Sequence, residues 1–149
     1  MKQLTVSAIK DGTVIDHLPP EVTFKVIKVL NLQKSDKTVT LAHNLKSKKM
    51  KKKGIVKVAG KALTQEEANK VALLAPTATV NIIKNYNVSK KLKLALPKQM
   101  NNIIKCSNPQ CITNHETVPT KFNLVSEKPL KLQCGYCERK MGRPDITLL

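Results

Sequence analysis

Hydrophobic residues recur at helical spacing in two segments of the first half of the chain. The first segment follows Pro19-Pro20-Glu21, which is typical of a first helical turn, and we expect this helix to end near Asn31. The second segment opens with a capping box, in which Thr64 precedes Glu67 by three residues, and Pro76 ends it. The apolar stripes of the two predicted helices are Val22, Val26, Ile27, Val29 and Leu30, and Ala68, Val71, Ala72 and Ala75.

Shorter apolar stretches around these helices predict strands. A turn at Asp11-Gly12 separates the first two stretches, and we expect the lysine-rich residues 46–53 to form a solvated loop. The order of strands, helix, two strands, helix and closing strands favours an α+β fold, a split βαβ sandwich with both helices on one face of an antiparallel sheet. The predicted strands are residues 4–9, 13–18, 37–41, 55–59, 78–84 and 88–94.

The pattern changes at Leu96-Pro97-Lys98, where we place the boundary between two domains. Residues 1–97 are expected to form the α/β sandwich, and residues 98–149 a smaller all-β module. All four cysteines of the chain lie in this second part. Its β-like stretches are residues 102–105, 121–125, 130–133 and 146–148.

The four cysteines have the spacing of two metal-binding knuckles. Cys106 and Cys111 form C-x4-C, and Cys134 and Cys137 form C-x2-C after twenty-two intervening residues. Four thiolates complete the tetrahedral shell of one Zn²⁺, so the ion should be structural, and His115 is not needed as a ligand. Two disulfides are the alternative, but the lack of a recognisable secretion signal favours a reducing compartment and zinc. Because this part has few large apolar side chains, zinc binding and folding should be one event.

Composition adds a strong positive charge. The 149 residues have a formal net charge of +17, carried almost wholly by lysine, which attracts nucleic acid, nucleotides, phosphates or an acidic protein surface. Only Phe24, Phe122, Tyr86 and Tyr136 carry aromatic rings, too few for binding that stacks bases, so we expect no nucleic-acid partner. The longest apolar run, residues 71–75, is too short to span a bilayer, and we expect a cytoplasmic protein with no membrane partner.

A search for catalytic motifs gives no candidate. The five glycines form no phosphate-binding loop, and neither G-x-S-x-G nor H-E-x-x-H occurs. Asp16 and His17 are the one titratable pair suited to acid–base chemistry, and an exposed strand end explains them more simply. We therefore expect a chain that is not an enzyme.

Residues 8–17 read AIKDGTVIDH, residues 75–81 read APTATVN, and Asn85-Tyr86 and the four cysteines follow. In combination these strings resemble the regulatory chain of aspartate carbamoyltransferase, and the resemblance runs nearly end to end. It implies a non-catalytic chain with a ferredoxin-like N-terminal allosteric domain and a C-terminal zinc domain, with one structural Zn²⁺, that contacts the catalytic chain. It also implies that three regulatory dimers join two catalytic trimers, with ATP activating and CTP and UTP inhibiting pyrimidine biosynthesis.

The resemblance further implies a site for nucleoside triphosphate effectors. Cationic side chains at Lys91 and His17 are expected to neutralise phosphate oxygens, and backbone groups at Ile9 and Tyr86 to read the base edge. Asp16 and Lys57 would reach the ribose hydroxyls, and Lys53 is a further candidate for a phosphate contact. Ser7 stands where some members of the family have an acid. The residues carried over by matching positions are Val6, Ala8, Ile9, Val14, Asp16, His17, Lys57, Asn81, Tyr86, Val88 and Lys91.

An alternative function belongs to a different class. A basic zinc-ribbon protein that binds RNA or the ribosome would fit both the charge and the four cysteines. Against it, no predicted strand carries the aromatic pair that a sheet-type RNA binder needs.

Overall fold

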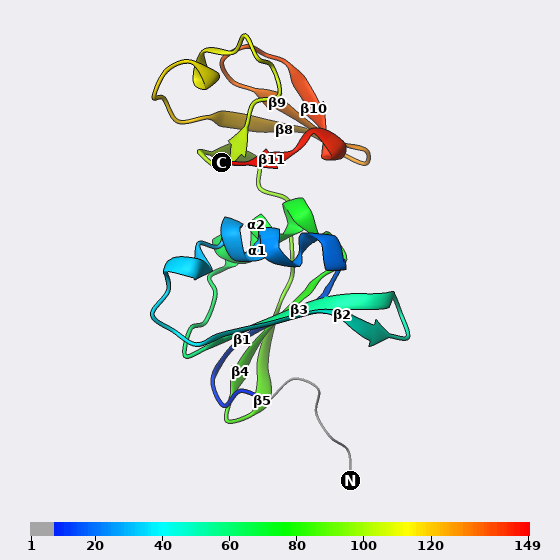
Figure 1. Ribbon diagram of the computed structural model, residues 1–149. Coiled ribbons are helices and arrows are strands. Elements are labelled where there is room, and N and C mark those ends of the chain that lie inside the picture. Colours follow the sequence, from blue (N-terminus) through cyan, green and yellow to red (C-terminus); the bar gives the residue numbers. More distant parts are fainter. Residues whose placement is uncertain (1–7) are drawn as a thin grey trace. The chain divides into compact units, whose positions relative to one another are not determined.

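The computed structural model describes residues 8–149 and divides the chain into two compact units, Met1–Ala95 and Leu96–Leu149 (Figure 1). Each unit has its own β-sheets and its own buried side chains: one sheet in the first unit and two in the second. Among the described residues, no helix is both long enough and apolar enough to cross a membrane.

The first unit is a five-stranded antiparallel sheet with two helices on one face (Figure 1). The strand order β2-β3-β1-β4-β5 gives the β-α-β-β-α-β connectivity of a ferredoxin-like sandwich with one added edge strand. The predicted fold class is therefore confirmed. The elements are β1 Gly12–Leu18, α1 Thr23–Val29, β2 Val39–Ser47, β3 Lys51–Ala59, α2 Gln65–Leu74, β4 Thr79–Lys84 and β5 Asn87–Leu92.

Alternate residues of the strands and the inner sides of both helices form the core of this unit. Ile15 of β1 pairs in register with Val56 of β3 and Val80 of β4, and all three are fully buried. They belong to one apolar cluster with Val26 of α1 and Val71 of α2. Since neighbouring strand residues point to opposite faces, the residues between these core positions lie on the face away from the helices.

Both helices begin and end close to the predicted positions. A 3-10 turn, Pro20–Val22, leads into α1, and Asn31 with a left-handed φ of 57° follows its end. At α2 the Thr64 hydroxyl accepts the backbone N–H of Glu67 at 3.1 Å, and the Glu67 carboxylate accepts the backbone N–H of Thr64 at 3.2 Å. The reciprocal capping box that the sequence predicts is therefore confirmed.

Two segments of the first unit differ from their predicted structure. The expectation of a solvated loop at residues 46–53 is wrong, because these residues form the end of the β2–β3 hairpin around a turn at residues 48–50. Consecutive lysines lack the alternation that indicates a strand, and the pairing of β2 with β3 extends the ladder through them.

Of the strand predicted at residues 4–9, residues 4–7 lie outside the described part, and Ala8 and Ile9 are not in a strand.

The second unit contains two small antiparallel sheets, as expected for an all-β module. One has the order β10-β9-β8-β6, and the other pairs β11 with β7. Phe122 of β8, Leu132 of β9 and Met141 of β10 are almost completely buried. Sequence analysis missed β6 and β10, three-residue strands that exist only through their neighbours. The strands are β6 Gln99–Asn101, β7 Ile104–Lys105, β8 Lys121–Glu127, β9 Leu130–Cys134, β10 Lys140–Gly142 and β11 Thr147–Leu148.

Candidate functional site

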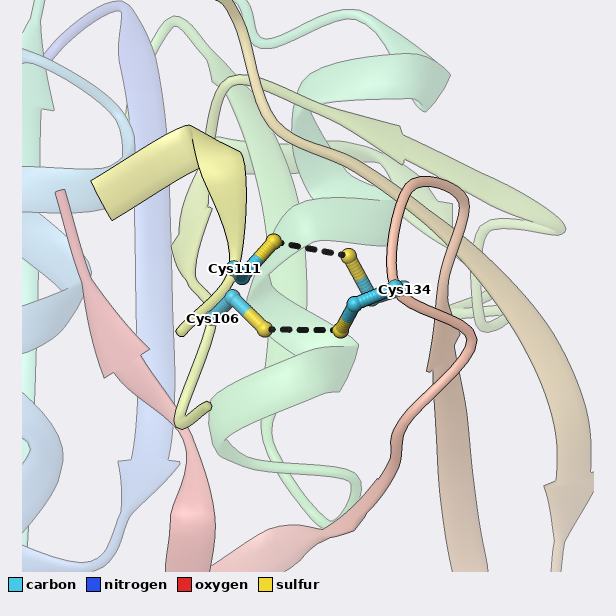
Figure 2. A group of neighbouring side chains, drawn as sticks. Cys106, Cys111 and Cys134 are labelled. Carbon is cyan, nitrogen blue, oxygen red and sulfur yellow. Dashed lines mark hydrogen bonds between the residues drawn. The ribbon is translucent and has the colours of Figure 1, made fainter. Parts of the chain in front are cut away.

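The sulfur atoms of the four cysteines converge in the second unit. All four Sγ atoms lie within 4.8 Å of one another, and the pairs Cys106–Cys137 and Cys111–Cys134 are each separated by 3.7 Å. Figure 2 shows the sulfurs of Cys106 and Cys111 turned toward the loop that carries Cys134. Thiolates at about 2.3 Å from a tetrahedral Zn²⁺ would lie about 3.8 Å from one another, so these separations fit one four-coordinate ion. None of the four cysteines forms a disulfide in this structure, and the 3.7 Å separations are far longer than the roughly 2.05 Å of an S–S bond.

Asparagine side chains shape the first knuckle. Asn114 donates through Nδ2 to the backbone oxygens of Cys106 at 3.0 Å and Asn108 at 2.8 Å. The Asn108 side chain accepts the backbone N–H of Gln110 at 3.0 Å, and its backbone oxygen accepts the N–H of Cys111 at 3.0 Å. The loop between the two cysteines is thus closed by hydrogen bonds, which hold both thiols toward the same point.

The second knuckle is the turn between β9 and β10. The backbone N–H of Cys134 donates to Arg139 O, and the N–H of Glu138 donates to Cys134 O, both at 3.0 Å. The N–H of Gly135 donates to Lys121 O at 2.7 Å, and a Cβ on Gly135 would lie only 3.2 Å from that oxygen. This close approach of two backbones favours glycine.

The thiols of Cys106, Cys134 and Cys137 ionise unequally. Burial raises the pKa of Cys134, and it raises the pKa of Cys106 to about 12. Burial also opposes ionisation of Cys137, but hydrogen bonds from the Asn108 side chain, the Arg139 backbone and the neighbouring thiols outweigh it and lower the pKa of Cys137 to about 7. A metal ion that binds here must therefore displace protons from the thiols of Cys106 and Cys134.

Two further side chains lie next to this metal centre. His115 is exposed, its Nε2 lies 2.7 Å from Pro109 O, and it does not belong to the group of potential metal ligands. Thr113 Oγ1 lies 3.2 Å from Cys111 Sγ, a hydrogen bond to the sulfur that sequence analysis missed. A hydroxyl two residues after a ligand cysteine is the sequence feature that could have indicated it.

The second candidate site is the face of the first unit's sheet that, within the described residues, carries no helix (Figure 1). The strand register places Lys57 of β3, Val14 of β1, Asn81 of β4 and Lys91 of β5 side by side in one row across this face. We call these four residues the effector row. All four were singled out as candidate effector residues from the resemblance, and strand pairing brings them together from distant parts of the sequence.

Burial sets the chemistry of the effector row. Lys57 is only 9% exposed, and burial lowers the pKa of its ammonium group against the attraction of Asp16. Asn81 Oδ1 is buried and has no hydrogen-bond partner among residues 8–149. An unpaired buried acceptor costs about 1–3 kcal/mol. A ligand that brings both a donor and an anionic group would satisfy this arrangement.

Asp16 and His17 lie at an irregularity near the end of β1, where the pairing with β3 shifts register and His17 has a φ of 58°. Asp16 Oδ1 accepts the backbone N–H of His17 at 2.6 Å and lies 2.9 Å from Lys53 Nζ in an ion pair. His17 Nδ1 lies 3.1 Å from Thr79 Oγ1. Sequence analysis did not identify Thr79, and only the pairing of β1 with β4 places it here.

The turn between β4 and β5 lies against the residues that precede β1. Asn85 and Tyr86 have left-handed φ values of 50° and 66°, as a two-residue hairpin turn requires. The N–H of Tyr86 donates to Lys10 O at 2.9 Å, and the N–H of Asn85 donates to Asp11 Oδ1 at 3.1 Å. Tyr86 therefore lies against the residue that follows Ile9.

The structure places two of the remaining three candidate effector residues. Val88 is exposed on β5, and Ala8 precedes β1. Val6 lies outside the described residues.

Comparison with known proteins identifies the family. Residues 4–95 match the model of the allosteric domain of the aspartate carbamoyltransferase regulatory chain, and residues 98–147 match that of its metal binding domain. The regulatory chains of Pyrococcus horikoshii and Thermococcus sibiricus are 55% and 54% identical, over 98% and 95% of this chain and 97% and 93% of the relatives. That of Bacteroides thetaiotaomicron is 42% identical over 98% of this chain and 95% of the relative. The chain belongs to the family of aspartate carbamoyltransferase regulatory chains.

Membership in the regulatory chain family decides between the hypotheses. The resemblance of the GTVIDH and APTATVN strings to this family is confirmed, and the chain is a regulatory rather than a catalytic subunit. The second unit is the metal binding domain of a regulatory chain, and its four thiolates fit one structural zinc ion. A basic zinc-ribbon protein of the ribosome would not match regulatory chains over nearly its whole length.

Proposed function

We propose that this regulatory chain binds nucleoside triphosphates on the open face of its N-terminal sheet and contacts the catalytic chain through its metal-binding unit. Three regulatory dimers join two catalytic trimers, ATP activates the holoenzyme, and CTP with UTP inhibits it, in pyrimidine biosynthesis. The matches of the two units to an allosteric and a metal binding domain support this division of roles. Four free thiols support a cytoplasmic location.

The unpaired Oδ1 of Asn81 is the observation that carries the nucleotide site. It lies in the effector row between Val14 and Lys91, and no described residue satisfies it. A ribose hydroxyl or an exocyclic amine is a donor of the right kind for this oxygen. Lys91 in the same row provides positive charge for phosphate groups, and Lys57 can reach the ribose.

The length of the site also supports a nucleotide. The turn that carries Tyr86 contacts the chain just before Gly12, whereas Asp16 and His17 lie toward the other end of β1. At about 3.3 Å per residue, the four steps from Gly12 to Asp16 span roughly 13 Å. An extended nucleoside triphosphate can reach over this distance, with the effector row at its middle.

The ion pair between Asp16 and Lys53 adds a step to effector binding. Both side chains are about one-fifth exposed, so a ligand on the open face can reach them. A ribose hydroxyl that donates to the Asp16 carboxylate competes with the Lys53 ammonium group for it. Lys53 is then released toward the phosphates, which adds a phosphate contact from β3 to that of Lys91 on β5.

Calorimetric titration of the zinc-loaded chain with ATP and with CTP tests the nucleotide site. Asn81→Ala should weaken both nucleotides by roughly five- to a hundredfold, because a hydrogen bond in a buried site contributes about 1–3 kcal/mol. Asn123→Ala is the control, since Asn123 is exposed on β8 of the other unit. Unchanged affinity in Asn81→Ala would contradict the placement of the site.

The assembly is tested by mixing this chain with catalytic trimers and measuring the mass of the product by analytical ultracentrifugation. The expected product contains two trimers and three regulatory dimers. A mixture in which the trimers sediment alone would contradict the proposed partnership, whatever the result of the nucleotide titration.

A further inference from the structure

We propose that the end of the β2–β3 hairpin binds the phosphate backbone of double-stranded nucleic acid without reading its bases. We call residues 45–53 the lysine ribbon. It contains none of the effector row, although Lys53 belongs also to the proposed nucleotide site, and the proposal does not depend on nucleotide binding there.

The lysine ribbon extends beyond the rest of the sheet. Strand β3 pairs with β1 only as far as Gly54, whereas its pairing with β2 continues through Lys53, Lys52 and Lys51. The partners of these three on β2 are Leu45, Lys46 and Ser47. Among the described residues, the end of the hairpin is therefore a two-stranded ribbon with no third strand beside it, as Figure 1 shows for the ends of β2 and β3.

The ribbon is positively charged on every side. Residues 39–59, the whole hairpin, contain seven lysines and no acidic residue. Since side chains alternate along a strand, Lys46 and Lys52 point to one face and Lys51 and Lys53 to the other, while the turn carries two more lysines. Lys53 is held by Asp16. The exposed lysines that form no ion pair with any described residue are Lys46, Lys48, Lys49, Lys51 and Lys52.

The register of the ribbon creates repulsion that an anion would relieve. Lys46 and Lys52 are direct cross-strand partners. Like charges in directly opposite positions destabilise an antiparallel pair, and their Cβ atoms are typically only about 4.5–5.5 Å apart. Anionic groups placed beside both ammonium groups turn this repulsion into attraction. One small anion can neutralise one such lysine pair, whereas a polymer of regularly spaced phosphates can neutralise the lysines of both faces and of the turn together.

The shape and the residue types favour duplex nucleic acid among polyanions. A two-stranded β-ribbon fits the major groove of a duplex, whose two flanking backbones then face the two sides of the ribbon. Lysine contacts phosphates as a point charge and fixes position without reading sequence. Residues 39–59 contain no Phe, Tyr or Trp, so the ribbon cannot stack the bases of a single strand. The proposal departs from the expectation of no nucleic-acid partner, which rested on the scarcity of aromatic rings; contacts of lysines with phosphates need no rings.

Fluorescence anisotropy with a labelled duplex of about 20 base pairs, at salt concentrations from about 50 to 200 mM, tests the proposal on the full zinc-loaded chain. The ribbon variant combines Lys46→Gln, Lys48→Gln and Lys52→Gln. The matched control combines Lys25→Gln, Lys28→Gln and Lys34→Gln, three lysines that are exposed and without an ion pair among the described residues. Each variant removes three charges from +17 and so has a net charge of +14.

The ribbon variant should bind the duplex at least about tenfold more weakly at the lowest salt concentration. The slope of log K against log salt should become shallower by about 0.9 for each phosphate that the variant no longer neutralises, or about 2.7 for three. The control variant should bind within about twofold of the unmodified chain. An unchanged or raised melting temperature of the ribbon variant is expected, because the Lys46–Lys52 repulsion is removed.

Three results would overturn the proposal. Equal losses in the two variants would mean that total charge rather than the ribbon attracts the duplex. Binding of poly-glutamate with no binding of the duplex would mean that the ribbon meets an acidic protein. A single strand that binds the unmodified chain as tightly as the duplex does, and whose affinity falls by the same factor in the ribbon variant, would contradict the fit to a groove.

Discussion

The core of the first unit is an apolar cluster of fifteen described residues, drawn from the sheet and from both helices. In Leu96–Leu149 the buried apolar side chains other than the cysteines are six: Met100, Ile104, Phe122, Leu130, Leu132 and Met141. We therefore expect the first unit to be stabilised by burial of apolar surface and the second to depend on metal–sulfur bonds. The two units should consequently lose their structure under different treatments, and ligand binding at one should leave the fold of the other intact.

Removal of the metal is expected to give the largest effect. Structural zinc supplies on the order of 10–16 kcal/mol of apparent binding free energy in small modules, so a chelator should unfold Leu96–Leu149. Cys111→Ala should have the same result, because three thiolates leave the shell incomplete. Hydrogen exchange read by mass spectrometry should show loss of protection in β8 and β9 and retained protection in β1 and α2.

The control for this experiment is His115→Ala, which should retain one zinc ion per chain because His115 lies outside the four-thiolate group. The holoenzyme should dissociate with the metal-free chain. A metal-free chain that keeps full protection in β8 would show that the six apolar side chains suffice, and the contrast between the units would be lost.

A cavity in the core of the first unit should destabilise that unit and leave the metal-binding unit intact. Ile15 is fully buried at the centre of the sheet, and truncation of such a residue to alanine costs about 2–5 kcal/mol. Ile15→Ala should therefore lower the unfolding transition of the first unit in a denaturant titration followed by circular dichroism. Zinc content should stay at one ion per chain, and loss of zinc would contradict the independence of the two units.

Removal of a charge from the effector row should weaken ligand binding and leave the stability of both units unchanged. A charged hydrogen bond to phosphate contributes about 1.5–3 kcal/mol, so Lys91→Ala should weaken ATP and CTP by a similar factor of roughly ten to a hundred. Calorimetry of the zinc-loaded chain measures the change. Lys90→Ala is the matched control, because neighbouring residues of β5 point to opposite faces of the sheet. Equal losses in both variants would place the phosphates elsewhere.

The smallest effect is expected at the start of α2. Thr64→Ala removes the side chain that accepts the N–H of Glu67 and should destabilise the first unit by about 0.5–2 kcal/mol. Thr64→Ser keeps the hydroxyl and should restore most of the stability. Thermal unfolding of the first unit measures both variants, and a drop of equal size in the serine variant would assign the loss to the methyl group instead of the cap.

Local sequence was sufficient to predict the two helices and the four cysteines that converge on one point. The capping box at Thr64, the prolines at the helix boundaries and the spacing of Cys106, Cys111, Cys134 and Cys137 are all short-range features. It was insufficient for residues 46–53, because a run of lysines carries no alternation and becomes a strand only through its partner. For the same reason the three-residue strands β6 and β10 were missed. The ion pair of Asp16 with Lys53 could not be found from the sequence, since it depends on the pairing of β1 with β3.

The sequence by itself determined what each unit needs in order to fold: apolar periodicity in the first, and four thiolates for one metal ion in the second. Only the tertiary structure decided which side chains meet on the open face. Lys57, Val14, Asn81 and Lys91 form one row because three separate strand pairings are in register, and a shift of one residue in any of them would turn that strand's side chain to the helical face. Register is set by contacts between residues far apart in the chain, and for this reason no local pattern reveals it.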